Sequence, residues 1–386
     1  MRVILAVGKG GVGKTTVAAA TALAAAARGH RTALLSVDPA HSLSDALGAE
    51  VGGRLRPIAP GLAAWEVDAL GELARSWEAV ARWLRALLRS DVDEVVAEEL
   101  LLFPGLEELV ALRAIGEVER LGAFDLCVVD CPPTGSALRL LRLPEVLRLV
   151  ADRLLDLERR GLRRVRPLLL GAGLGSLVPG EAALDGLESL HRDSVAVREI
   201  LTDAERTSAR LVLTPARVVV AESRRAWSHL SVHGVATDAV VANRLLGPLA
   251  GGAGLGRWLE RERRELAEIE ATFPVPLLRL PRAAREPVGL SALRELGEKL
   301  YGERDPAARL TTAPPLRLGR CGPDVLVELD LPGARKDDLR VVEDDGELRI
   351  GLGPSERRLV LPEPLSRHHV VSARLEGRVL RIRLAP

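Results

Sequence analysis

Cysteine is scarce in this chain, and long apolar runs are missing. Its three cysteines are too few for a secreted disulfide framework. Cys127 and Cys131, four apart in a predicted strand, are expected to be buried small residues rather than a metal pair. No apolar run reaches the length of a membrane span, and the N-terminal segment lacks the pattern of a signal peptide. A net charge of +1 gives no global field for nucleic acid. We therefore expect a cytoplasmic protein with no membrane span and no nucleic-acid partner.

The length and composition favour two folded domains. A chain of 386 residues is long for a single hydrophobic core. Hydrophobic residues make up 47% and charged residues 28%, which is the balance of an ordinary globular protein and excludes wholesale disorder.

The strongest signal lies near the start of the chain. Val3–Val7 is a short apolar run that predicts a buried strand, and Gly8–Thr15 (GKGGVGKT) fits the phosphate-loop pattern G-x-x-x-x-G-K-[ST]. A helix is expected over the Ala-rich stretch Val17–Ala27, with Gly29 as its C-terminal cap. Strand, glycine loop and helix in this order are the context of a phosphate loop, and a turn used for packing alone is the alternative.

The residue types of this loop suit MgATP. Glycines let several backbone N–H groups point at one anion, and the helix N-terminus adds partial positive charge. Lys14 is expected to bridge the β- and γ-phosphates, and the Thr15 hydroxyl to ligate Mg²⁺. Only four residues of the chain are lysines, and two of them, Lys9 and Lys14, lie here, where a compact ammonium fits between phosphate oxygens. The expected nucleotide-binding residues of the loop are Gly10, Gly11, Val12, Gly13, Lys14, Thr15 and Thr16.

Two acidic residues stand at the ends of predicted strands. Thr32–Val37 predicts a strand followed by Asp38, and Asp125–Asp130 (DLCVVD) predicts another. Ligands of open α/β sheets gather at the carboxyl ends of strands, so the Asp38 carboxylate is expected to orient the attacking water. Asp-Pro also starts turns, which is the alternative for Asp38. Asp130 is the expected Mg²⁺ partner, and a capping role in a turn is its alternative.

Three stretches together resemble one family. VGKGGVGKTT, DPAHSLSD and DCPPTGSALRLLRLPE are similar to the phosphate loop, first switch and second switch of the ArsA/Get3 family of ATPases. The resemblance covers about residues 1–300. It implies a homodimer in which Lys9 reaches the nucleotide of the facing subunit and Asp38 orients water. It also implies that Asn243 hydrogen-bonds the adenine and that Pro281 borders the base, while the Thr134–Gly135 loop reports phosphate release.

The chain departs from the family at several points. It lacks the cysteine cluster of an arsenite site, the C-x-x-C pair that holds zinc between subunits, and the methionines of a client groove. Residues 62–120 and 147–201 have apolar positions at helical spacing and are expected to form helical insertions. In the family such insertions handle clients, whereas an ordinary core is the alternative.

The pattern changes near residue 305. The stretch 305–319 is rich in Pro and Ala and is expected to be a linker after an ATPase domain at 1–304. Beyond it, 320–386 alternates at period two, with strands expected at 325–331, 339–342, 347–352, 357–361 and 378–384. This predicts a small antiparallel sandwich, which resembles the HSP20-like (α-crystallin) domain attached to some ArsA-like ATPases.

The sequence therefore predicts an α/β fold, a mostly parallel sheet flanked by helices, with a C-terminal β-sandwich. The expected function is a homodimeric ATPase that uses ATP and Mg²⁺. By resemblance, its cycle would energise export of an anion or metalloid such as arsenite through a membrane transporter. The alternative is a nucleotide-gated targeting factor for hydrophobic or tail-anchored protein segments, working with a receptor. A partitioning-type regulator is a third possibility, without a basic surface helix to support it.

Overall fold

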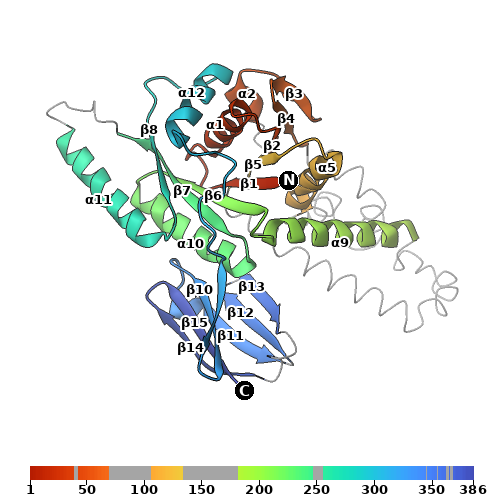
Figure 1. Cartoon of the computed structure of the whole chain (residues 1–386), viewed down its shortest axis with the longest axis vertical. Helices are drawn as coiled ribbons and strands as arrows, with labels where there is room; N and C mark the ends of the chain where they lie inside the picture. Colours follow the sequence, from red (N-terminus) through yellow and green to blue (C-terminus); the bar gives the residue numbers. More distant parts are fainter. Residues whose placement is uncertain are drawn as a thin grey trace, which may run out of the picture. The chain divides into compact units, whose positions relative to one another are not determined.

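An eight-stranded sheet forms the centre of the fold (Figure 1). The computed structural model describes residues 1–38, 42–68, 106–133, 181–246, 255–344, 346–353, 355–361, 365 and 368–386, without the side chains of 106–112, 181–184, 187, 190 and 360. Spatial contacts between residues divide the chain into two compact units. The first holds residues 1–66, 118–138 and 200–386, and the second holds 67–117 and 139–199.

The large sheet has the order β3-β4-β2-β5-β1-β6-β7-β8, and only β3 runs antiparallel to its neighbour. Its strands are β1 (Arg2–Val7), β2 (Thr32–Ser36), β3 (Arg56–Ala59), β4 (Leu62–Glu66), β5 (Leu126–Asp130), β6 (Thr207–Leu213), β7 (Thr237–Leu245) and β8 (Leu277–Pro281). The first strand, β1, lies between β5 and β6. The chain leaves β1 where the strand order reverses, which is where open α/β sheets bind ligands.

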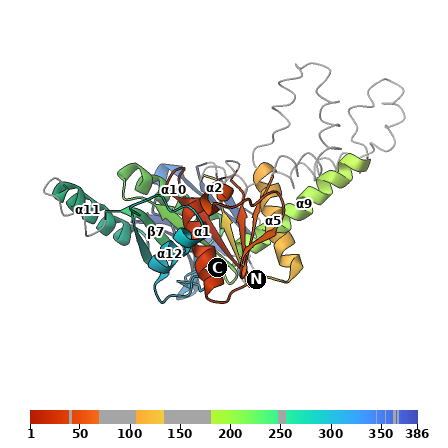
Figure 2. The same ribbon diagram turned by 90° about the horizontal axis from the view of Figure 1, so that it is seen from above.

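Helices cover both faces of this sheet, as expected for buried parallel strands. On one face lie α1 (Lys14–Ala27) and α12 (Leu290–Tyr301), packed on Val212, Ala239 and Val241. On the other, α10 (Arg217–His233) and α11 (Gly256–Thr272) pack on the alternate residues of the same strands. Figure 2 shows α12 and α10 on opposite sides of the sheet. The predicted fold class is confirmed.

The contact between α1 and α12 depends on a glycine. A Cβ at Gly297 would lie 2.3 Å from the carbonyl oxygen of Ala20 and 2.9 Å from the Cβ of Ala24. Near the end of α12 the Tyr301 hydroxyl and the Thr21 hydroxyl are 2.7 Å apart. The close approach lets α12 fix the helix that carries the phosphate loop.

A buried polar cluster links β1, β6 and β7 to the chain that follows α12. The Arg210 side chain, 1% exposed, donates to both carboxylate oxygens of Asp238 and to the Tyr301 hydroxyl. Arg2 donates to Asp238 at 3.0 Å, and Arg210 also donates to the carbonyl of Ala308. The charges are paired, which is the condition for burying them.

The first predicted elements are found within a few residues of their expected bounds, but the expectation for residues 62–66 is wrong. These residues were expected to begin a helical insertion, and they form the buried strand β4. Four small or apolar residues in a row, Leu62–Trp65, suit a strand with both faces covered, and periodicity cannot separate such a run from a buried helix.

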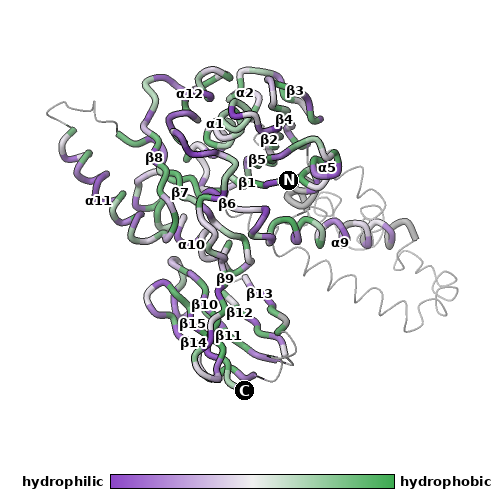
Figure 3. The backbone as a smooth tube through the Cα atoms, in the orientation of Figure 1, coloured by the Kyte–Doolittle hydropathy of each residue, from purple (hydrophilic) through white to green (hydrophobic). Residues whose placement is uncertain are grey.

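The second unit contains parts of two helices within the described residues. They belong to α5 (Leu106–Leu121) and α9 (Glu181–Thr202), and a salt bridge of 3.1 Å joins Arg113 to Asp193. Most of the length of the predicted insertions at 62–120 and 147–201 lies outside the described residues. No helix in the described ranges is both long and apolar enough to cross a membrane. Figure 3 shows α11 as mainly hydrophilic.

The C-terminal part is a β-sandwich of two antiparallel sheets, β14-β15-β10-β9 and β11-β12-β13. Its core holds the inward-facing members of the period-two pattern, among them Val327, Ile350 and Ile382. The strands are β9 (Leu316–Cys321), β10 (Asp324–Asp330), β11 (Leu339–Asp344), β12 (Glu347–Leu352), β13 (Ser355–Val360), β14 (His369–Glu376) and β15 (Val379–Ala385). β9 begins inside the stretch expected to be linker, and β14 was not anticipated.

The sandwich packs on the C-terminal half of α10. Val232 of that helix belongs to the sandwich core. The backbone N–H of Gly333 donates to the Ser228 hydroxyl at 2.8 Å, and a Cβ at Gly333 would lie 2.5 Å from the backbone nitrogen of Arg225. His229 Nδ1 and the Ser355 hydroxyl are 2.9 Å apart. The sandwich is therefore anchored on a helix that covers the large sheet.

Candidate functional site

The loop after β1 has the backbone of an anion cradle. Gly11 and Gly13 have φ angles of +80° and +94°, the left-handed region that favours glycine. Gly13 caps α1, so the first amides of that helix face the loop. A Cβ at Gly8 would lie 2.2 Å from the carbonyl oxygen of Val212 in β6, so only glycine fits there. Val12 is buried in the core and holds the loop against the sheet.

Lys14 and Asp38 meet beside this loop. The Lys14 side chain is only 6% exposed, and its Nζ is 4.0 Å from Oδ2 of Asp38. Asp38 follows the carboxyl end of β2, two strands away from β1. A cation suited to phosphate therefore lies next to a carboxylate that could orient water.

Thr15 and Asp130 form the second pair. The Thr15 hydroxyl donates to Oδ2 of Asp130 at 2.6 Å. The Ser42 hydroxyl lies 3.1 Å from Thr15 Oγ1. The Thr15 hydroxyl has a single hydrogen, which it donates in the hydrogen bond to Asp130. Ser42 is therefore the donor in the contact between the two hydroxyls. Ser42 thus lies beside Thr15, a contact that no sequence pattern indicated.

The Asp130 carboxyl is fully buried. Burial raises its pKa to about 7, while the Thr15 hydrogen bond and the Lys14 charge act in the opposite direction. Its other oxygen, Oδ1, is buried and makes no hydrogen bond of normal geometry among the described residues, although the nearby Ser36 hydroxyl also acts to lower the pKa of the carboxyl. A buried carboxylate oxygen without a normal hydrogen bond, next to a threonine hydroxyl, fits a hard divalent cation that prefers oxygen ligands.

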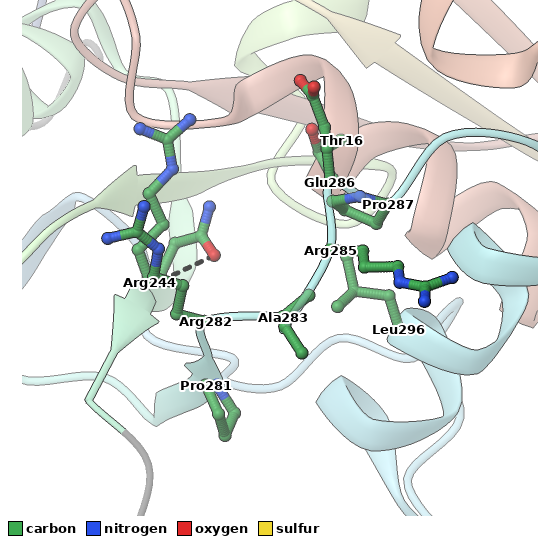
Figure 4. A pocket seen from close by; sticks show the side chains of 11 residues that line it. Thr16, Arg244, Pro281, Arg282, Ala283, Arg285, Glu286, Pro287 and Leu296 are labelled. Carbon is green, nitrogen blue, oxygen red and sulfur yellow. Dashed lines mark hydrogen bonds between the residues drawn. The ribbon is translucent and has the colours of Figure 1, made fainter. Parts of the chain in front are cut away.

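Thr16, Asn243 and Pro281 line one cavity of about 390 Å³. Figure 4 shows the chain from Pro281 to Pro287 forming one wall, with Arg244 at the end of β7 opposite Arg285 and Leu296. Its volume suits a small organic ligand, and it is lined by polar and basic groups.

Asn243 is already engaged with the phosphate loop. Its Nδ2 donates to the carbonyl of Val12 at 2.8 Å, and its Oδ1 accepts the backbone N–H of Arg244. Each amide end keeps some hydrogen-bonding capacity, since Nδ2 has a second hydrogen and Oδ1 a second lone pair. Besides the expected contact with a base, Asn243 therefore fixes the loop to β7. Arg244 has a φ angle of +59°, the left-handed conformation that this arrangement imposes on a residue with a side chain.

Lys9 lies at the outer side of the loop. Its Nζ pairs with Oε2 of Glu222 on α10 at 3.0 Å, and both side chains are about one-third exposed. Lys9 is thus at the surface, as a residue directed to a facing subunit would be. Glu222 was not predicted, because nothing in the sequence places α10 beside the loop.

Two of the three cysteines are inert in this fold. Cys127 and Cys131 are buried, and burial raises the pKa of the Cys127 thiol to about 12 and that of Cys131 still further. Thiolate is the form that binds soft metals, and these thiols stay protonated. They are the small core residues that the sequence indicated. The described residues hold no group of three or more His, Cys, Asp or Glu side chains that could bind a metal.

One predicted functional segment, the Thr134–Gly135 loop, lies outside the described residues. Of the residues that are described, Lys14, Thr15, Asp38 and Asp130 come together at the carboxyl edge of β1, β2 and β5. A phosphate loop with a paired lysine and two acidic strand ends at this edge is the site of a P-loop nucleotide hydrolase.

The family follows from comparison with known proteins. Residues 1–302 match the model of the anion-transporting ATPase family, and residues 324–384 match that of the HSP20-like domain found in ArsA. The chain belongs to this family and is an ATPase. The sandwich identified by its alternation is the HSP20-like domain.

Relatives cover nearly the whole chain. A protein of Chlorobaculum tepidum named as an arsenical pump-driving ATPase is 33% identical over 370 residues, 95% of this chain and 91% of the relative. One of Aquifex aeolicus with a similar name is 30% identical over 388 residues, 97% and 98% of the two chains. ATPase GET3B of Arabidopsis thaliana is 30% identical over 322 residues, 76% of this chain and 77% of the relative.

Proposed function

We propose that this chain is a MgATP-hydrolysing homodimer whose nucleotide cycle drives transport or targeting. The observation that carries the proposal is the joining of Lys14 to Asp38 and of Thr15 to Asp130 at one sheet edge. Lys14 and the loop amides would bind the β- and γ-phosphates, and Asp38 would orient the attacking water. Positioning and electrostatic stabilisation supply most of the catalysis of phosphoryl transfer.

Magnesium is the proposed metal. The Thr15 hydroxyl and the Asp130 carboxylate would hold it, directly or through water, and its charge would neutralise the phosphates. The donor set supports this assignment, because it is made of hard oxygens and includes the Asp130 oxygen without a normal hydrogen bond among the described residues. In this proposal Asp130 loses its proton when the cation binds.

The dimer assignment rests on Lys9. We propose that Lys9 leaves Glu222 and reaches the nucleotide of the facing subunit, where it neutralises charge between the β- and γ-phosphates. The exposure of both side chains supports this proposal. An exposed ion pair contributes little to stability, so Lys9 can give up its contact with Glu222 for one with a phosphate. The base would lie in the cavity of Thr16, Asn243 and Pro281.

The cargo has two candidates. Names of the relatives from Chlorobaculum and Aquifex favour export of an arsenical, with this chain energising a membrane transporter. The second candidate is targeting of hydrophobic protein segments. Two observations favour this second candidate. The buried thiols of Cys127 and Cys131 stay protonated and are therefore poor ligands for a metalloid, and the chain carries a β-sandwich, packed on α10, that could contact a protein client.

Stimulated ATPase activity separates the two candidates. The rate of the purified chain is measured with arsenite or antimonite and, separately, with a tail-anchor-like hydrophobic helix. Lys14→Ala serves as the blank, since it removes the phosphate-binding cation. Stimulation by the metalloid alone supports export and contradicts targeting, and stimulation by the helix alone does the reverse.

Oligomeric state tests the dimer directly. Light scattering of the unmutated protein with MgATP should give twice the monomer mass. Lys9→Ala should weaken this association, whereas Lys299→Ala, which removes an exposed lysine of α12 paired within its own helix, should not. A parent that stays monomeric with MgATP contradicts the proposal.

A further inference from the structure

Glu66 is a buried carboxylate that no sequence motif indicated. It is the last residue of β4 and its side chain is 8% exposed. An ionised carboxylate in such a position is costly unless donors satisfy it. Three donors do so, all from one short segment that directly follows Ser42.

The donors belong to α2 (Leu43–Leu47), the helix that follows Asp38 and Ser42. Oε1 of Glu66 accepts the backbone N–H groups of Leu43 and Ser44 at 2.8 and 3.0 Å. Oε2 accepts the Ser44 hydroxyl at 2.6 Å. The helix has no side-chain cap of its own at Ser42, so Glu66 supplies the cap from 23 residues away.

Strand register explains why Glu66 can do this. Ser36 of β2 pairs with Glu66 on one side and with Asp130 on the other. Paired residues of a parallel sheet share a face, so Glu66 and Asp130 stand at one level and point to the side of α1. Asp130 holds the Thr15 hydroxyl, and Glu66 holds the segment that brings Ser42 to the same hydroxyl.

We propose that Glu66 is a positioning residue of ATP hydrolysis, which fixes the start of α2 so that Ser42 meets Thr15. It acts through hydrogen-bond geometry and touches neither nucleotide nor metal. Glu66 keeps the start of α2, and with it Ser42, in place beside the phosphate loop. The inference rests on the proposed roles of Thr15 and Asp130.

Two conservative variants separate position from charge. Glu66→Gln keeps the length of the side chain and the carbonyl oxygen that accepts the two amides, but it loses the charge. Its NH2 group replaces the oxygen that accepts the Ser44 hydroxyl, so this hydrogen bond must reverse, with Ser44 Oγ as the acceptor. Glu66→Asp keeps the charge but shortens the side chain by one methylene, so the carboxylate no longer reaches the start of α2. If Glu66 acts by position, Glu66→Gln retains kcat within about threefold, and Glu66→Asp lowers kcat about tenfold or more. In both variants KM for ATP changes by less than about threefold, because the phosphate loop is intact. A larger loss in Glu66→Gln than in Glu66→Asp overturns the proposal.

A double-mutant cycle tests the route through Ser42. Ser42→Ala is combined with Glu66→Asp, and the loss of kcat in the double variant should equal that of the more severe single variant. Losses that multiply overturn the proposal. Glu50→Ala is the matched control, because Glu50 lies just after α2 but is 85% exposed, and it should keep the parent rate.

Amide exchange tests the same idea without nucleotide. The amides of Leu43 and Ser44 should exchange at least tenfold faster in Glu66→Asp than in the parent, while those of β1 stay unchanged. Unchanged exchange at Leu43 and Ser44 overturns the proposal, whatever the ATPase rate. An inactive parent with the predicted exchange pattern would instead contradict the proposed roles of Thr15 and Asp130.

Discussion

Replacing Asp130 with asparagine should make the protein more stable and less active. The Asp130 carboxyl is buried with its pKa raised to about 7, so its charged form costs free energy in the folded state. Asparagine has nearly the same shape, and its carbonyl oxygen can accept the Thr15 hydroxyl. The variant therefore keeps the hydrogen bond and removes the cost of burying a charge, while it loses the proposed partner of Mg²⁺.

The pH dependence of this effect has a definite sign. Between the ordinary pKa of 3.8 and the folded value of about 7, the folded protein holds a proton on Asp130 that the unfolded chain has lost. The contribution of Asp130 to the free energy of unfolding therefore falls as pH rises through that window. Above about pH 7 this contribution no longer changes with pH. A shift of about 3 pK units corresponds to about 4 kcal/mol as an upper bound. In a chain of this length, about 1 kcal/mol moves the melting temperature by about 1 °C.

Melting curves at pH 5 and pH 8 measure the effect. We expect Asp130→Asn to melt as much as about 4 °C higher than the parent at pH 8, by the conversion above, and to show a smaller gain at pH 5. Asp238→Asn is the control of opposite sign, since Asp238 is equally buried but paired with Arg210 and Arg2. An Asp130→Asn variant that melts below the parent at pH 8 would refute the reasoning, because the charge would then be stabilised by its surroundings.

Two further predictions concern glycines at close contacts. Gly333→Ala should loosen the sandwich from α10 and lower the melting temperature, because its Cβ would meet helix backbone, whereas Gly319→Ala in the same sandwich has only one atom within 4.0 Å and should have little effect. Equal melting of the two variants would show that the contact is not required. Gly297→Ala should cost more than the roughly 1 kcal/mol that alanine gains in a helix. Gly256→Ala, at the exposed first residue of α11 with no described atom within 4 Å of its Cβ, should not destabilise the protein, and equal losses for Gly297→Ala and Gly256→Ala would contradict the packing argument.

Local chemistry let the sequence determine the phosphate loop. Gly8, Gly11 and Gly13 are needed for the course of the backbone and Lys14 for charge, and all of them stand within seven residues of the chain. The strands that end at Asp38 and Asp130 were also predictable, since an apolar run followed by one acid is a local pattern. The sandwich was foreseen through its alternation, except for the two edge strands β9 and β14. β9 is half-buried only at its first two residues and exposed afterwards, and β14 alternates only between exposed and half-buried positions, with an irregularity between Val370 and Ser372.

Contacts between distant segments were decided by the tertiary structure. Asn243 bonds a carbonyl 231 residues away, Glu222 reaches Lys9, and Glu66 caps a helix formed earlier in the chain. Even the strand β4 was mistaken for a helix, because a continuous apolar run has no period to separate the two. The sequence encodes the period and chemistry of each segment. Which strand ends stand side by side depends on the strand order of the folded sheet, and only that order brings Glu66, Asp130 and Thr15 to one edge.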